Sequence, residues 1–179
     1  WIARMDPDDI CVPDRFQVQR NQLQDLSYPD VLCSEMVELS KLRKNMRKCR
    51  ICKSIPKLPF WLMNPIYNVT SIIKKEVYLQ VGGYEKIPNF VDYLFWFKVY
   101  KKGFRIECTE YTSVIVNLGE NISDRRGGLN YLYWELYFYF HLYMKGYLGF
   151  LKCLFAISLR TPFRILPKFL RKFIWYFRN

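Results

Sequence analysis

Three carboxylates within four positions are the feature of this sequence best suited to chemistry. They form the segment Asp6-Pro7-Asp8-Asp9, which follows the short apolar run 1–5. Negative charges so close together repel one another, and a divalent cation such as Mg²⁺ or Mn²⁺, which prefers hard oxygen ligands, would neutralise them. The segment is equally compatible with a solvated turn in which an aspartate caps the following helix. The residues alone leave both interpretations open.

A second cluster combines a glycine pair with an acidic helix start. Gly82 and Gly83 precede Tyr84, Asp92 begins a predicted helix, and Trp96 lies four residues beyond it. A glycine pair allows a tight turn and a close approach of the backbone. The simpler interpretation is that Asp92 only caps its helix.

The elements that must position these clusters follow from the apolar pattern and from the breaks between apolar runs. Strands are predicted at 1–5 (buried), at 31–39 with Val31, Cys33, Val37 and Leu39 on one side, and at 66–73, 104–108 and 112–116. Helices are predicted from about Pro13 to Leu26, with Phe16 and Leu23 on one face, and over 75–81 and 92–101. The run 41–57 holds eight basic residues and no acidic one, and it is predicted as an exposed loop or short helix. In open sheets of alternating strands and helices, ligand sites lie beyond the carboxyl ends of strands.

The composition indicates a folded, basic chain. Of its 179 residues 51% are hydrophobic and 18% aromatic, which excludes intrinsic disorder. The net charge is +12, yet residues 1–40 carry three basic and eight acidic groups, so the excess of positive charge lies entirely in 41–179. An acidic start suits a metal or polar substrate, and a basic, aromatic remainder suits an anionic surface. No apolar stretch reaches the roughly 18 residues of a membrane span, and six cysteines in a chain this long indicate a reducing compartment.

Several weaker signals favour structural interpretations. Cys49 and Cys52 have CxxC spacing, but no second pair or nearby histidine completes a zinc site. The single histidine, His141, lies in an aromatic segment and is predicted to be packed there. No nucleic-acid-binding signature accompanies the basic run 41–57, so no nucleic-acid partner is expected.

Three motifs, in the right order, resemble family 2 glycosyltransferases. WIARMDPDDICVPDRF (1–16) resembles the donor-site motif of that family. NPIYNVTSIIKKEVYLQVGGYEKIPNFVDYLFW (64–96) resembles its Asn-Pro segment, Gly-Gly-Tyr turn and catalytic helix. RRGGLNY (125–131) resembles the segment that follows in bacterial members that build surface polysaccharides. The resemblance covers nearly the whole chain.

The resemblance implies an α/β, Rossmann-like GT-A fold. Residues 1–125 would form part of a GT-A catalytic domain whose first strands precede Trp1, and 126–179 a helical, membrane-associating region. The implied reaction is inverting transfer of a sugar from a nucleotide-sugar donor to a hydroxyl of a glycan or lipid-linked acceptor. Asp6 and Asp8 would hold Mg²⁺ or Mn²⁺ against the donor diphosphate, with Asp8 the more direct ligand and Asp9 in support.

The resemblance also assigns the remaining site residues. Asp92 matches the general base, and Gly82, Gly83, Tyr84 and Trp96 match the acceptor side. Arg125 and Arg126 either contact phosphate or lie on the surface. Val91 stands where the family usually has Glu, and Asn68 stands where His is common. These two departures and the absent first strands favour an alternative, a non-catalytic, membrane-associated remnant of such an enzyme.

The C-terminal third is predicted to dock on a membrane without crossing it. From Arg125 onward ten basic residues face a single acid, Glu135, and bulky aromatic residues lie between them. This pattern is typical of a helix in the plane of an anionic leaflet. The alternative is that the aromatic faces pack on the catalytic domain. The predicted location is cytoplasmic, peripheral on the inner face of the plasma membrane.

Overall fold

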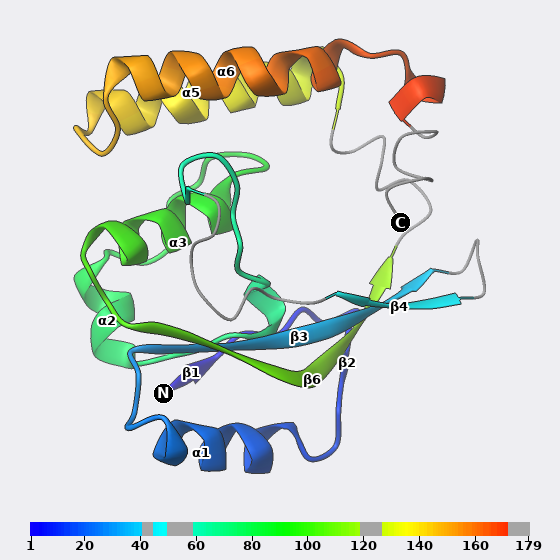
Figure 1. Ribbon diagram of the computed structural model, residues 1–179, viewed down its shortest axis with the longest axis vertical. Helices are drawn as coiled ribbons and strands as arrows, with labels where there is room; N and C mark the ends of the chain where they lie inside the picture. The colour runs from blue at the N-terminus through cyan, green and yellow to red at the C-terminus, as the bar shows by residue number, and fades with distance from the viewer. Residues whose placement is uncertain (41–44, 50–58, 119–126, 172–179) are drawn as a thin grey trace. The chain divides into compact units, whose positions relative to one another are not determined.

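The computed structural model describes residues 1–40, 45–49, 59–118 and 127–171 (Figure 1). The chain forms two compact units. The first comprises Trp1–Gly83 and Phe95–Glu120, and the second comprises Tyr84–Leu94 and Asn121–Asn179. The sequence predicted a single boundary near 125, whereas the second unit also takes up residues 84–94 from the middle of the chain.

A mixed sheet forms the centre of the first unit. Its strands are β1 (Ile2–Ala3), β2 (Ile10–Cys11), β3 (Val31–Ser40), β4 (Asn45–Cys49), β5 (Ile72–Ile73) and β6 (Ile106–Leu118). They are arranged in the order β1-β5-β3-β6-β2, with β4 paired to β3. β3 and β6 are parallel, and the other pairs are antiparallel. β1, β3 and β6 therefore point in the same direction. A parallel pair within an α/β sheet agrees with the predicted Rossmann-like class.

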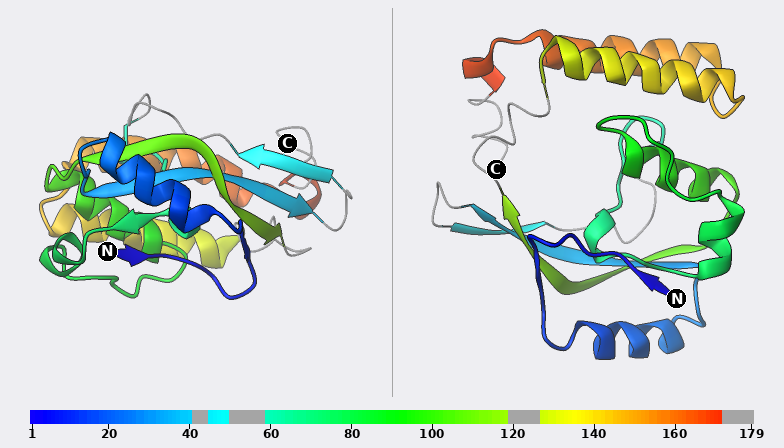
Figure 2. Two further views of the ribbon diagram at one scale, coloured as in Figure 1. Left: turned by 90° about the horizontal axis from the view of Figure 1, so that it is seen from below. Right: turned by 180° about the vertical axis from the view of Figure 1, so that it is seen from behind.

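Helices cover both faces of this sheet. In the first unit α1 (Arg15–Asp25) lies on one face, and α2 (Lys75–Gln80) with the later part of α3 (Val91–Lys101) lies on the other (Figures 1 and 2). The first five residues of β3 are consequently all buried, as expected for a strand covered on both sides. The predicted alternation of inward and outward residues along 31–39 is therefore wrong for that half of the strand.

The predicted helices are confirmed, but the buried face of α1 differs from the prediction. Leu23 is buried, whereas Phe16 is exposed. Arg15 and Gln19 are buried instead, and the Gln19 side-chain amide donates a hydrogen bond to the carbonyl of Thr70 at 3.0 Å. Apolar spacing failed here because two polar side chains find hydrogen-bond partners inside the fold.

Four predicted strands, and the exposed loop or short helix predicted at 41–57, need correction. β1 is only two residues long and partly exposed, not a buried strand over 1–5. In 66–73 a 3-10 helix, η1 (Asn68–Thr70), precedes the short β5. The predicted strands 104–108 and 112–116 are one strand, β6, whose pairing register with β3 shifts where a break was expected. The predicted loop 41–57 contains β4, which forms a ladder with β3; the rest of 41–57 lies outside the described residues.

The second unit is a helical hairpin. α5 (Leu129–Met144) and α6 (Phe150–Ile165) are joined by a turn at Lys145 and Gly146, and a helical turn follows at 168–171. Phe90 stacks on Phe138 with ring centroids 4.9 Å apart, which fastens the segment Tyr84–Leu94 to the hairpin. No helix within the described residues is long and apolar enough to cross a membrane.

Candidate functional site

The carboxylate segment lies at the carboxyl end of the parallel strands. Residues 4–9 leave β1 and lead into β2, at the opposite end of the strand order. Asp6 accepts a hydrogen bond from the amide of Asp9, which makes residues 6–9 a turn. Because β1, β3 and β6 share one direction, this turn lies where open α/β sheets bind ligands.

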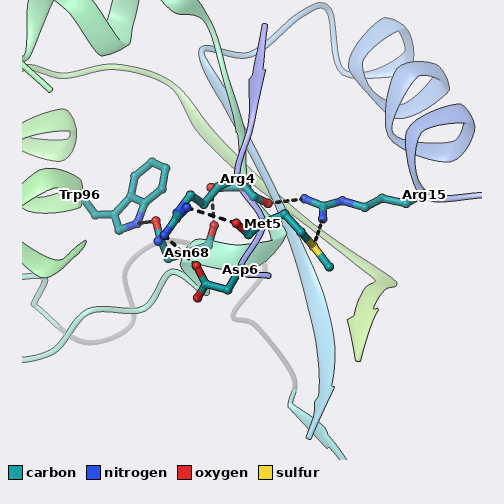
Figure 3. Close-up of polar contacts among 7 residues, drawn as sticks. Arg4, Met5, Asp6, Arg15, Asn68 and Trp96 are labelled. Carbon is teal, nitrogen blue, oxygen red and sulfur yellow. Dashed lines mark hydrogen bonds and ion pairs between the residues drawn. The ribbon is translucent and has the colours of Figure 1, made fainter. Parts of the chain in front are cut away.

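Two neighbouring side chains leave β1 in opposite directions. The Arg4 guanidinium forms an ion pair with Asp6, with 2.7 Å between Nη2 and Oδ1. On the other side, Arg15 of α1 donates to the Met5 sulfur at 3.3 Å and to the Arg4 carbonyl at 3.1 Å (Figure 3). Side chains alternate across an extended chain in this way. The result places Asp6 on the α3 side of the sheet, and Arg15 fixes the backbone from behind.

Asn117, near the end of β6, holds the rest of the turn. Its side-chain amide donates to the Asp8 carbonyl at 2.6 Å, and its backbone amide donates to the Asp9 carboxylate at 3.2 Å. The pKa of Asp9 is raised above its ordinary value, mainly by burial and further by the charges of Asp8 and Asp6, against the lowering effect of the Asn117 hydrogen bond. The turn therefore concentrates negative charge that no described cation fully offsets.

The carboxylates of Asp6 and Asp8 could hold one hard cation only if a ligand supplied further oxygen atoms. Asp6 is already paired with Arg4, whereas the exposed Asp8 carboxylate has no hydrogen-bond or ion-pair partner within the described residues. No three His, Cys, Asp or Glu side chains in the described part of the chain come together as a closed metal site. Carboxylate oxygens that are free on one side fit Mg²⁺ or Mn²⁺, which are commonly bound through one or two carboxylates together with phosphate oxygens of a substrate.

Trp96 and Asn68, which the sequence analysis singled out separately, form a hydrogen bond on the α3 side of the sheet (Figure 3). The Trp96 indole of α3 donates to the side-chain oxygen of Asn68 at 3.2 Å. Trp96 is completely buried, so its polar edge requires such a partner. Figure 3 shows this pair and the Arg4–Asp6 pair on one side of β1. Trp96, predicted on the acceptor side, is therefore held in place by Asn68.

The glycine pair terminates α2. Gly82 and Gly83 both have positive φ, +79° and +64°, which glycine adopts without strain. A Cβ at Gly83 would also lie 3.0 Å from the Tyr78 hydroxyl, so the position is tight as well as left-handed. The Lys98 ammonium donates to the Gly83 carbonyl at 3.4 Å, which ties the turn to α3.

Asp92 and Tyr84 belong to the second unit, whereas Asp6, Asp8 and Asp9 belong to the first. Asp92 is the second residue of α3 and is exposed. It therefore lies in the first helical turn, not at the cap position that the alternative interpretation gave it. A negative charge there is favourable, because the helix N-terminus carries a partial positive charge. Tyr84 is half-buried.

Some predicted residues lie outside the described part, and some contributors were missed. Arg125 and Arg126 fall outside the described residues, as does Cys52. Arg4 and Asn117 were not predicted, although each contacts the carboxylate turn directly. Asn117 interrupts the apolar run 114–116 at its end, and this was its only sequence signal.

Comparison with known proteins supports a glycosyltransferase. The chain is 28% identical over 178 residues to an uncharacterized glycosyltransferase of Haemophilus influenzae, covering 96% of this chain and 65% of that protein. It is 25% identical to the amylovoran biosynthesis glycosyltransferase AmsE of Erwinia amylovora, covering 97% and 66%. It is also 25% identical to the UDP-Gal:alpha-D-GlcNAc-diphosphoundecaprenol beta-1,3-galactosyltransferase of Escherichia coli, covering 97% and 64%.

The chain therefore spans just under two thirds of the length of these curated relatives. No protein-family model matches it. Two of the three relatives are named for glycan-building steps, one in amylovoran biosynthesis and one on a diphosphoundecaprenol-linked sugar.

Proposed function

We propose that the intact protein is an inverting family 2 glycosyltransferase of GT-A fold. It transfers a sugar from a nucleotide-sugar donor to a hydroxyl of a glycan or lipid-linked acceptor in polysaccharide biosynthesis. The observation that carries the proposal is the carboxylate turn at the carboxyl ends of the parallel strands, with Asp8 exposed and unpaired within the described residues. The similarity to three glycosyltransferases over almost the whole chain supports it.

In this proposal the turn binds the donor diphosphate. Asp8, assisted by Asp6, would hold Mg²⁺ or Mn²⁺, and the bound metal would stabilise the negative charge of the departing nucleoside diphosphate. Asp9, fixed by the Asn117 amide, contributes further negative charge beside it. Arg4 keeps Asp6 oriented, and Arg15 keeps the backbone of the turn in place from the opposite side of the sheet.

Asp92 is proposed as the general base. The acceptor oxygen attacks the anomeric carbon as Asp92 takes up its proton, and the bond from that carbon to the diphosphate oxygen breaks with its electron pair leaving on the nucleoside diphosphate. Direct displacement inverts the anomeric configuration. The Gly82–Gly83 turn, Tyr84 and, through Asn68, Trp96 shape the acceptor side. Arg125 and Arg126 are proposed as further phosphate contacts.

The proposed location is the cytoplasmic side of the plasma membrane, because a lipid-linked acceptor is confined to a membrane. The E. coli relative is named for a UDP-galactose donor and a diphosphoundecaprenol-linked acceptor. UDP-galactose and a GlcNAc-diphospho-lipid are therefore the first donor and acceptor to test with this protein.

The test is transfer of radiolabelled sugar to lipid by the full-length protein, with Mg²⁺, with Mn²⁺ and with a chelator. Asp8→Ala should abolish both turnover and metal-dependent donor binding. Asp25→Ala removes an exposed carboxylate at the end of α1 and serves as the matched control with unchanged activity. Full activity of Asp8→Ala in chelator would contradict the metal role. Absence of transfer by the wild-type protein across a panel of donors would favour the non-catalytic remnant, the alternative suggested by Val91 and Asn68.

A further inference from the structure

The α5–α6 hairpin buries a cluster of one carboxylate and two guanidinium groups. Glu135 of α5 is buried, and both of its oxygens accept hydrogen bonds from α6. Arg160 Nε lies 2.6 Å from one oxygen, and Arg164 Nε lies 2.8 Å from the other. Arg164 also lies over the Tyr131 ring, 4.5 Å from its centroid. The sequence predicted these arginines to contact an anionic leaflet, but the structure assigns them to the interior of the hairpin.

The outward face of α6 is apolar. Its buried residues, Cys153 and Ala156, lie on the same helix face as the two paired arginines, as the 3.6-residue repeat requires. The opposite face carries large apolar side chains that are exposed: Leu151 (77%), Leu154 (53%), Phe155 (57%), Leu159 and Ile165. This is the reverse of a water-facing helix, which places its charges outside.

α5 repeats the arrangement. Its single carboxylate is the buried Glu135, and no lysine or arginine lies between Leu129 and Met144. The arc opposite Glu135 exposes Leu129, Tyr133, Leu136, Tyr137, Phe140, Tyr143 and Met144. Two neighbouring helices thus both expose apolar side chains, three of them tyrosines. Tyrosine is enriched where a bilayer meets water.

Among the described residues of the hairpin and the helical turn that follows it, every exposed charged side chain is positive. Glu85, of the segment that packs on the hairpin, lies 3.4 Å from Nε2 of His141 on α5. Lys145 lies in the turn between the helices, Lys152 in the first turn of α6, and Lys168 just after α6, and all three are exposed. A second copy of the chain would bring like charges together if it packed face to face on this surface. An anionic lipid surface matches both the apolar centre and the basic margin.

We propose that the α5–α6 hairpin docks on an anionic phospholipid bilayer by immersing its outward apolar side chains in the interface. Arg160 and Arg164 stay paired with Glu135 inside the hairpin, and Lys145, Lys152 and Lys168 face the headgroups. The inference rests on the proposed function in one respect, since a lipid-linked acceptor explains why the protein would need a membrane. It deepens that function by naming the surface through which the enzyme reaches its acceptor.

The experiment is co-sedimentation of the full-length protein with vesicles of phosphatidylcholine alone or with roughly one-third phosphatidylglycerol. The test variant is Leu154→Ser/Phe155→Ser. The matched control, Leu79→Ser/Phe16→Ser, changes one leucine and one phenylalanine of similar exposure (63% and 58%) in the first unit. We expect the test variant to lower the partition coefficient about tenfold or more and the control to leave it unchanged. Lys152→Gln/Lys168→Gln should weaken binding several-fold on anionic vesicles only.

The inference is overturned if the test variant binds vesicles as well as the wild type, or if the wild type binds neither vesicle. It is also overturned if the apolar face instead forms a dimer that the test variant abolishes while vesicle binding persists. Near-ultraviolet circular dichroism checks that each variant is folded, and Leu151→Gln repeats the test with a single, more exposed residue. Transfer to a water-soluble acceptor analogue separates the two proposals. Loss of vesicle binding with transfer intact supports docking, whereas absent transfer in every variant contradicts only the proposed enzymatic function.

Discussion

The two units of this chain bury charge in different ways. In the first unit the buried guanidinium of Arg15 donates to neutral acceptors within the described residues, among them the Gln19 side chain at 3.0 Å. In the second unit the buried carboxylate of Glu135 is matched by two guanidinium groups. In the first unit Asp8 of the carboxylate turn is exposed. In the second unit the exposed face of α6 opposite the paired arginines is apolar.

The titration behaviour reflects this difference. Burial lowers the pKa of Arg15, because no carboxylate within the described residues compensates for the loss of water. Burial by itself would raise the pKa of Glu135, but the hydrogen bonds and charges of Arg164 and Arg160 outweigh it and hold that pKa below its ordinary value. A buried charge with neutral partners thus serves to position a backbone, whereas a paired one fastens two helices.

The largest expected effect asks whether the second unit also takes part in chemistry. Asp92→Asn should lower the transfer rate about 10²–10⁴-fold with donor binding nearly intact, because the amide keeps the shape but cannot accept the proton. Glu76→Gln, at the corresponding exposed first-turn position of α2, is the matched control and should keep full activity. Initial rates at saturating donor measure the effect. An Asp92→Asn rate equal to wild type would restrict Asp92 to stabilising its helix.

The next prediction concerns the buried ion pairs of Glu135 with Arg160 and Arg164. Glu135→Gln should destabilise the protein by about 3 kcal/mol, because it leaves two largely buried guanidinium groups without their counter-charge. Glu107→Gln removes the partner of Arg105 in a more exposed pair and should cost at most about 1 kcal/mol. Urea unfolding monitored by tryptophan fluorescence compares the two. Equal losses would remove the distinction between the interior and surface pairs.

A smaller effect is expected for the buried Arg15, whose hydrogen bonds go to neutral acceptors within the described residues. Arg15→Met keeps the side chain long and apolar but leaves the Gln19 oxygen and the Arg4 carbonyl without their donor, so we expect a loss of about 1–3 kcal/mol. Arg20→Met changes an exposed arginine of the same helix and should alter stability by less than about 0.5 kcal/mol. If Arg15 positions the turn, its variant also weakens metal-dependent donor binding, whereas the Arg20 variant does not.

The smallest expected effect is a pH dependence of the stability that the Glu135 ion pairs contribute. Because the folded-state pKa of Glu135 is depressed, its stabilising contribution is complete above the unfolded-state pKa, near 4.5, and is lost as the pH falls through the folded value. The stability difference between wild type and Glu135→Gln should therefore be constant near neutral pH and shrink below about pH 4. Unfolding curves over this range measure it. A difference that grows on acidification would reverse the assigned sign.

Local signals were sufficient for the helices but not for the sheet. Gly82 and Gly103 mark the ends of α2 and α3, and both adopt the positive φ that their positions suggested. β6 was divided in two because its polar stretch around Glu110 resembled a break, whereas the structure accommodates it as a register shift within one strand. Phe16 was misplaced because buried polar partners, not apolar spacing, determine which side of α1 faces inward.

In the candidate site, too, the local features could be predicted from the sequence and the long-range contacts could not. The carboxylates are contiguous in sequence and could be predicted from it. Asn117 could not, because its contact with the turn depends on β2 pairing with β6 from the far end of the chain. The pairing of Trp96 with Asn68 likewise became apparent only in three dimensions, although each residue was noted separately.

The Asn117 contacts also bear on how the protein folds. One of these contacts joins residues that are 108 positions apart in the sequence, and the other joins residues that are 109 positions apart. The parallel pairing of β3 with β6 also joins distant parts of the chain. Closing such long loops costs entropy before any contact rewards it, so long-range pairings form slowly compared with local helices. The carboxylate turn gains its final shape only once β6 has docked. In a refolding experiment, helical signal should therefore recover before the capacity to bind a ligand at this turn.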